Sequence, residues 1–136
     1  MGIFDIFGKK DVSDSTKKIP FSIKTFFVPV RLAAHKVDSV DLHILMKNMQ
    51  EEPVLTSIVV ETPNGLGLDQ SGISKVKETR FGYLGKGEEK EVIVPIWGTV
   101  TTEQGEYNIV ITIYQHYRTY AYVLNSIKKG IDIRVV

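Results

Sequence analysis

The chain has 136 residues, of which 43% are hydrophobic and 24% are charged, and its formal net charge is +1. This length suits a single domain, and the balanced charge argues against a protein that binds nucleic acid through electrostatic attraction. The sequence contains no cysteine, which excludes disulfide bonds, thiolate metal sites and thiol catalysis. Because it has no stretch of about 18 apolar residues, the sequence predicts no membrane-spanning helix.

The first residues differ in pattern from the rest of the chain. Residues 1–10 predict a short amphipathic helix, and the polar residues 11–18 predict a linker. On a helix of 100° per residue, four apolar side chains share one arc of roughly 160°. Two turns are too short to be helical alone in water, so we expect the segment to dock on its own domain, on a second copy or on a membrane, or else to be disordered. The four apolar residues are Ile3, Phe4, Ile6 and Phe7.

Lysines near this segment favour weak contact between residues 1–10 and an anionic membrane surface. The segment lacks the charged start and the long apolar core of a secretory signal. We therefore expect a cytoplasmic protein, located at the membrane periphery if the segment binds lipid. The lysines are Lys9, Lys10, Lys17 and Lys18.

Residues 19–136 predict a single all-β domain. The chain has 15 Ile, 16 Val and 10 Thr but only three Ala, and β-branched side chains favour strands. Val40–Met46 alternates apolar and polar residues, as a half-buried strand does. Seven to nine short strands separated by turns predict an antiparallel β-sandwich. The expected strands are 19–24, 25–34, 40–46, 54–61, 75–84, 90–97, 107–114, 120–124 and 130–136.

The order of motifs along these strands is more specific. The strand within LHILMKNM ends at Asn48, and the next strand ends in ETP at Glu61–Pro63. After them come YLGKGEEKEVIVPI, GEYNIVITIY, an Asn-containing hairpin at Leu124–Ser126 and a final IDIRV strand. From Val30 to Val136 the chain resembles immunoglobulin-like modules of the CARDB type, the cell-adhesion-related domains of bacteria and archaea. The resemblance implies an immunoglobulin-like sandwich, and this family supplies no general catalytic residues.

The sequence offers few candidate residues for catalysis or for binding a metal or phosphate. Asp41 and His43 share a strand face at i, i+2, but spacing supplies no third and fourth metal ligand. The glycine-rich loop 63–74 lacks the Lys-Ser/Thr ending of a phosphate loop, and Asp69 lacks the other acidic positions of a calcium loop. We therefore expect no catalytic residue, no metal and no cofactor, and we interpret the protein as a non-enzyme.

Five of the six tyrosines fall within sixteen residues, Tyr107–Tyr122. They predict either a cross-strand aromatic ladder or a surface that binds a partner. The leading functional interpretation is a non-catalytic protein-interaction or scaffolding module, whose partner is another protein or a second copy of the chain. The alternative is a small-ligand or carbohydrate-binding module that uses the Tyr107–Tyr122 hairpin. The candidate interaction residues are Ile3, Phe4, Ile6, Phe7, Tyr114, Tyr117, Tyr120 and Tyr122.

Overall fold

The computed structural model describes residues 21–136, so the expected helical segment 1–10 and the linker 11–18 lie outside the described residues. All regular secondary structure within residues 21–136 is β-strand, which confirms the all-β prediction. The described part of the chain holds no helix that could cross a membrane. The strands are β1 (Phe21–Val28), β2 (Arg31–Leu32), β3 (Asp38–Asn48), β4 (Val54–Glu61), β5 (Leu66–Gly67), β6 (Val76–Leu84), β7 (Glu89–Gly98), β8 (Gly105–Tyr117) and β9 (Thr119–Val135).

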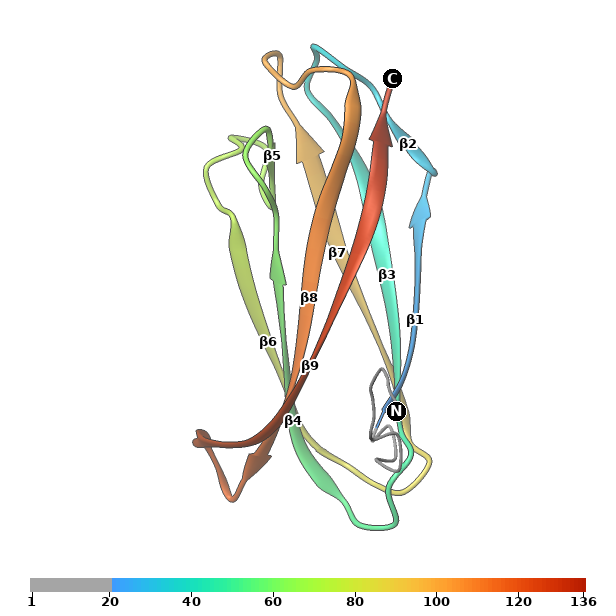
Figure 1. The fold of residues 1–136 in the computed structure, drawn as a ribbon, viewed down its shortest axis with the longest axis vertical. Helices are drawn as coiled ribbons and strands as arrows, with labels where there is room; N and C mark the ends of the chain where they lie inside the picture. Colours follow the sequence, from blue (N-terminus) through green and yellow to red (C-terminus); the bar gives the residue numbers. More distant parts are fainter. Residues whose placement is uncertain (1–20) are drawn as a thin grey trace, which may run out of the picture.

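These strands form two sheets that pack face to face (Figure 1). The first sheet has the order β1-β3-β7-β5, and the second has the order β2-β9-β8-β4-β6. Every pairing is antiparallel except that of β2 with β9, which is parallel. The predicted antiparallel sandwich is therefore confirmed.

The core lies between the sheets and is built from alternate residues of their central strands. Successive side chains of a strand point to opposite faces, so a period-two apolar pattern places one row inward. Each side chain of the two central rows is exposed by 1% or less. Burying such rows stabilises the fold by about 25 cal/mol per Å² of apolar surface. The row of β3 is Val40, Leu42, Ile44 and Met46, and that of β8 is Ile109, Ile111 and Ile113.

The chain changes sheet between β1 and β2. Pro29, which follows a cis peptide bond, lies between these strands and has no N–H to donate to a ladder. Beyond it, Arg31 and Leu32 pair with Arg134 and Val135 at the end of β9. Because β2 is only two residues long, the rest of the outer edge of β9 has no neighbouring strand among the described residues.

The last two predicted strands are in fact one. The expected turn at Leu124–Ser126 is wrong, because β9 runs without interruption from Thr119 to Val135. Gln115 pairs with Asn125 and Tyr114 pairs with Ser126, so long-range pairing with β8 overrides the local turn preference of Asn and Ser. The real turn lies at Arg118, whose φ of 66° is in the left-handed region.

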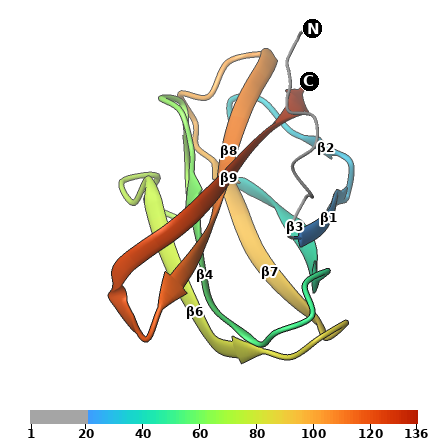
Figure 2. The ribbon, with the colours of Figure 1, turned by 60° about the horizontal axis from the view of Figure 1, so that its bottom comes forward.

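The joined ends of β8 and β9 reach past the rest of their sheet. Register shifts on either side of His116 mark an irregularity in this pairing, and such irregularities increase the local twist and bend of a strand pair. The hairpin end accordingly turns to the side of β6, as Figures 1 and 2 show. This bend brings residues of the hairpin against the outer face of their own sheet.

Candidate functional site

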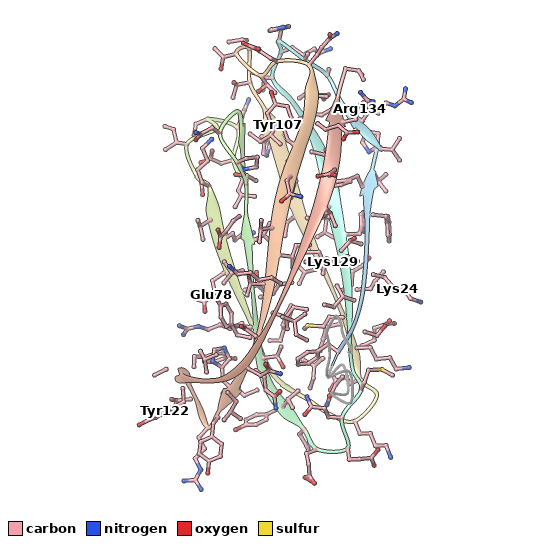
Figure 3. All side chains as sticks on the ribbon, viewed as in Figure 1. Lys24, Glu78, Tyr107, Tyr122, Lys129 and Arg134 are labelled. Carbon is pink, nitrogen blue, oxygen red and sulfur yellow. The ribbon has the colours of Figure 1, made fainter. Side chains whose placement is uncertain are left out.

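The predicted tyrosines divide among different places along the β8–β9 hairpin. Tyr107 lies at the start of β8, where its hydroxyl donates to the carbonyl oxygen of Glu103 at 2.8 Å. Tyr114 and Tyr120 are half-buried near the hairpin end. Tyr117 and Tyr122 are 49% and 67% exposed, and Figure 3 shows Tyr122 on the hairpin end, far along the hairpin from Tyr107. The five rings therefore do not share one surface.

Four residues, Ser57, Arg80, His116 and Tyr120, fix the hairpin end to the sheet, and we call them the hairpin anchor. The ring of His116 is 6% exposed, and its Nε2 shares a hydrogen bond of 2.7 Å with the Ser57 hydroxyl on β4. The ring of Tyr120 meets that imidazole edge-on, with the centroids 5.0 Å apart. Aromatic pairs favour this geometry, so the contact joins the two arms of the hairpin to β4.

Strand β6 supplies the other half of the hairpin anchor. The Tyr120 hydroxyl accepts a hydrogen bond of 2.9 Å from the backbone N–H of Gly82, and the guanidinium carbon of Arg80 lies 4.6 Å from the Tyr120 ring centroid. The β4–β6 register shifts between Thr56 and Ser57, so that Phe81 has no pairing partner on β4. Gly82 adopts a φ of 75°, which is open to glycine at little cost. The bulge thus frees a backbone donor for Tyr120.

The Ser57–His116 pair was not predicted from the sequence, and its surroundings are those of a structural contact. The two residues are 0% and 6% exposed, so a substrate cannot approach the serine hydroxyl. A serine nucleophile also needs a histidine oriented through its second nitrogen. Among the described residues, Nδ1 of His116 has no hydrogen-bond partner. The pair therefore anchors the hairpin and is not arranged for catalysis.

Beyond the anchor, the hairpin end carries exposed apolar side chains on adjacent positions. Arg118 places its guanidinium carbon 5.0 Å from the ring centroid of Tyr117, a cation–π arrangement. Val123 and Leu124 are 53% and 59% exposed and follow Tyr122 along β9. We call Tyr117, Tyr122, Val123 and Leu124 the hairpin strip.

A hollow of about 510 Å³ lies at another place, between the edge strands β1 and β9. Phe21 at its base is 2% exposed, whereas Met49 at its rim is 55% exposed. Sequence reasoning missed this hollow because its walls come from opposite ends of the chain. The lining residues are Phe21, Ser22, Ile23, Met49, Ile127, Lys128 and Lys129, and Figure 3 labels Lys129 on β9.

The remaining candidate polar groups have local partners. The His43 ring stacks on Phe26 with centroids 4.6 Å apart, and its Nδ1 lies 3.1 Å from a carboxylate oxygen of Glu91. Asp69 bonds within its own loop. Its carboxylate accepts a hydrogen bond from the Ser71 hydroxyl, and this bond lowers the pKa of the Asp69 carboxyl. Within residues 21–136, no three His, Asp or Glu side chains lie together as metal ligands would.

Comparison with known proteins identifies the fold. No protein-family model and no curated protein sequence matches this chain significantly. Among solved structures it is similar to native alpha-2-macroglobulin from Escherichia coli, spanning domain MG7 to the C-terminus, with a TM-score of 0.64 and 18% identity. That match covers 86% of this chain and 16% of the macroglobulin chain.

Two further solved structures are similar over nearly their whole length. A conjugative transposon lipoprotein from Bacteroides eggerthii has a TM-score of 0.50 and 16% identity, covering 85% of this chain and 98% of its own. A CARDB domain from Pyrococcus furiosus, solved in complex with di-metal ions, has a TM-score of 0.49 and 19% identity, covering 85% and 89%. At these identities the likeness concerns the fold alone. The described chain is an immunoglobulin-like sandwich, as expected, and a CARDB domain is among the structures similar to it.

Proposed function

We propose that this protein is a non-catalytic protein-interaction module, and that the hairpin strip is its contact surface. The observation that carries the proposal is the exposure of Tyr122, Val123 and Leu124, at 67%, 53% and 59%, on an edge of β9 that no described strand covers. Aromatic residues and Arg are enriched at protein interfaces, and a few such residues supply most of the binding energy. Arg118 and Tyr117 extend the same surface.

The hairpin anchor makes this surface suitable for binding. A partner that binds a flexible loop must offset the entropy lost when the loop is ordered. Here Tyr120 is held by Gly82 and Arg80, and His116 is held by Ser57. The strip therefore lies next to residues that are already fixed to the sheet, which limits the backbone that a partner must order on binding.

A protein partner explains the strip better than a small ligand does. Small-molecule sites are concave and enclose most of the ligand surface. Tyr122 instead lies on the projecting hairpin end (Figure 3), and the hollow described above is lined by other residues. Exposed apolar side chains beside an open strand edge suit an extended segment of another protein, which can add a strand there.

The double variant Tyr122→Ala with Leu124→Ser tests this proposal. The wild-type protein is used to capture binding proteins from its native cell, and the affinity of each recovered protein is then measured by calorimetry. We expect the double variant to bind the partner about 100-fold more weakly, since the loss of interface anchors costs 2 kcal/mol or more.

The matched control is Ile73→Ala, which removes a side chain that is 80% exposed in the loop between β5 and β6. This control should bind like the wild type. Equal affinity for wild type and the double variant, with melting points unchanged, would show that the partner binds elsewhere.

A further inference from the structure

The β1–β9 hollow is an apolar surface that the described residues leave open. Its walls are formed by Phe21 and Ile23 of β1 and by Ile127 of β9. Ile23 and Ile127 pack against the core, although each is only partly buried. With a volume of about 510 Å³, the hollow lies within the size range of sites that enclose a ligand.

The neighbouring strand edge also lacks a cover among the described residues. From Thr119 to Ile133, β9 pairs with β8 on one side only, and β2 reaches no further than Arg134. Natural sheets usually cover a long edge with a loop or helix, or protect it with charges, because unpaired N–H and C=O groups recruit other strands. Lys128 and Lys129 protect the middle of the edge, but the hollow beside them remains apolar.

The chain itself supplies a segment that can fill this hollow. Phe21 is the first described residue, and it lines the hollow, so residues 1–20 join the described chain at this site. Residues 3–7 carry four apolar side chains on one helical arc and are too short to fold alone. Between them and Phe21 lie residues 8–20, which span at most about 45 Å when fully extended.

We propose that Ile3, Phe4, Ile6 and Phe7 occupy the β1–β9 hollow of the same chain. A short tether gives the segment an effective concentration in the millimolar range at its own hollow. A second copy at micromolar concentration competes about a thousandfold less well, so we infer docking within one chain. The proposal does not depend on the function of the hairpin strip, which lies where β8 and β9 are joined.

Cross-linking between introduced cysteines tests the docking directly, because the chain has no cysteine of its own. The test variant carries Gly8→Cys and Met49→Cys, which mark the end of the segment and the rim of the hollow. The matched control carries Gly8→Cys and Tyr83→Cys; Tyr83 is 59% exposed on β6, compared with 55% for Met49. A short bismaleimide reagent is added to each variant, and the rate of cross-linking within one chain is measured.

We expect the Met49 pair to cross-link within one chain about tenfold faster than the Tyr83 pair, because docking raises the local concentration near the hollow. Adding Phe4→Asp and Phe7→Asp should reduce the Met49 rate to that of the control, since a buried unpaired charge is strongly disfavoured. These Asp changes alter none of the described core residues, all of which lie between Phe21 and Val135.

Three results would overturn the proposal. Equal rates for the Met49 and Tyr83 pairs would show that the segment does not dock in the hollow. Cross-links that form only between two chains, when Gly8→Cys and Met49→Cys proteins are mixed, would assign the segment to a second copy. Flotation of the wild-type protein with phosphatidylserine vesicles, together with equal rates for the two cysteine pairs without vesicles, would assign the segment to a membrane surface.

Discussion

Asn48 closes the turns at one end of the sandwich. Its side-chain amide donates to the carbonyl oxygens of Leu84 and Glu52, both at 3.0 Å, and to that of Gly85 at 3.2 Å. Its side-chain oxygen accepts a hydrogen bond of 2.9 Å from the backbone N–H of Gln50. Asn48 is fully buried, so one side chain satisfies backbone groups of two connections, β3–β4 and β6–β7.

Asn48→Ala should therefore lower the free energy of unfolding by about 3 kcal/mol, because it leaves several buried backbone groups without partners. The matched control is Asn125→Ala, since Asn125 is exposed on β9 and its side-chain oxygen bonds only the backbone N–H of Ser126. That change should cost no more than about 0.5 kcal/mol. Urea denaturation measures both. Similar losses for the two variants would contradict the role assigned to Asn48.

At the scale of the strands, the β8–β9 hairpin separates two kinds of tyrosine. Tyr120 is half-buried in the hairpin anchor, whereas Tyr122 on the same strand is 67% exposed. A ladder in which every ring packs equally does not describe this hairpin. The two residues should therefore respond differently to truncation.

Tyr120→Ala should lower the free energy of unfolding by about 3 kcal/mol, because it removes a packed ring and the acceptor for the Gly82 N–H. Tyr122→Ala should change stability by less than about 0.5 kcal/mol, as exposed substitutions do. Tyr120→Phe keeps the ring and should lose about 1 kcal/mol for the hydrogen bond alone. Thermal melts of the three variants check the order. A large loss for Tyr122→Ala would mean that this side chain is packed in solution.

The strands that the sequence predicts well are those whose pattern reflects the core directly. Val40–Met46 alternates because one face of the strand is buried. The observed strand β3 contains this predicted strand and is longer at both ends. The turn at Leu124–Ser126 was expected because Asn and Ser favour turns locally. It is not formed, because Tyr114 and Gln115 of β8 pair with Ser126 and Asn125 of β9. Pairing between distant segments decided the outcome, and a local pattern does not contain that information.

For the candidate sites too, local patterns predicted one part, and contacts between distant strands decided the rest. The clustering of tyrosines pointed to the β8–β9 hairpin, but not to which rings pack and which are exposed. That difference depends on Arg80, Gly82 and Ser57, which belong to other strands. The β1–β9 hollow has no local signal at all, because Phe21 and Ile127 come together only when both sheets are complete.

For the whole molecule, β2 is the element that ties the two sheets together. The chain leaves β1 in the first sheet, and Arg31 and Leu32 then pair with Arg134 and Val135 in the second. Leu32 is fully buried in the common core, while Val30 just before it is 70% exposed. The backbone N–H of Val136 donates to the carbonyl oxygen of Leu32 at 2.9 Å, which joins the end of the chain to the same point.

Leu32→Ala should lower the free energy of unfolding by about 3 kcal/mol, as large-to-small changes in a core do, whereas Val30→Ala should have little effect. The fluorescence of Trp97, the single tryptophan, reports on β7 in the first sheet, and far-UV circular dichroism reports on both sheets. Because one core is shared, both signals should change in a single coincident transition. Leu32→Ala should shift them together to lower denaturant. Separate transitions in the variant would show that the sheets unfold independently and that β2 does not couple them.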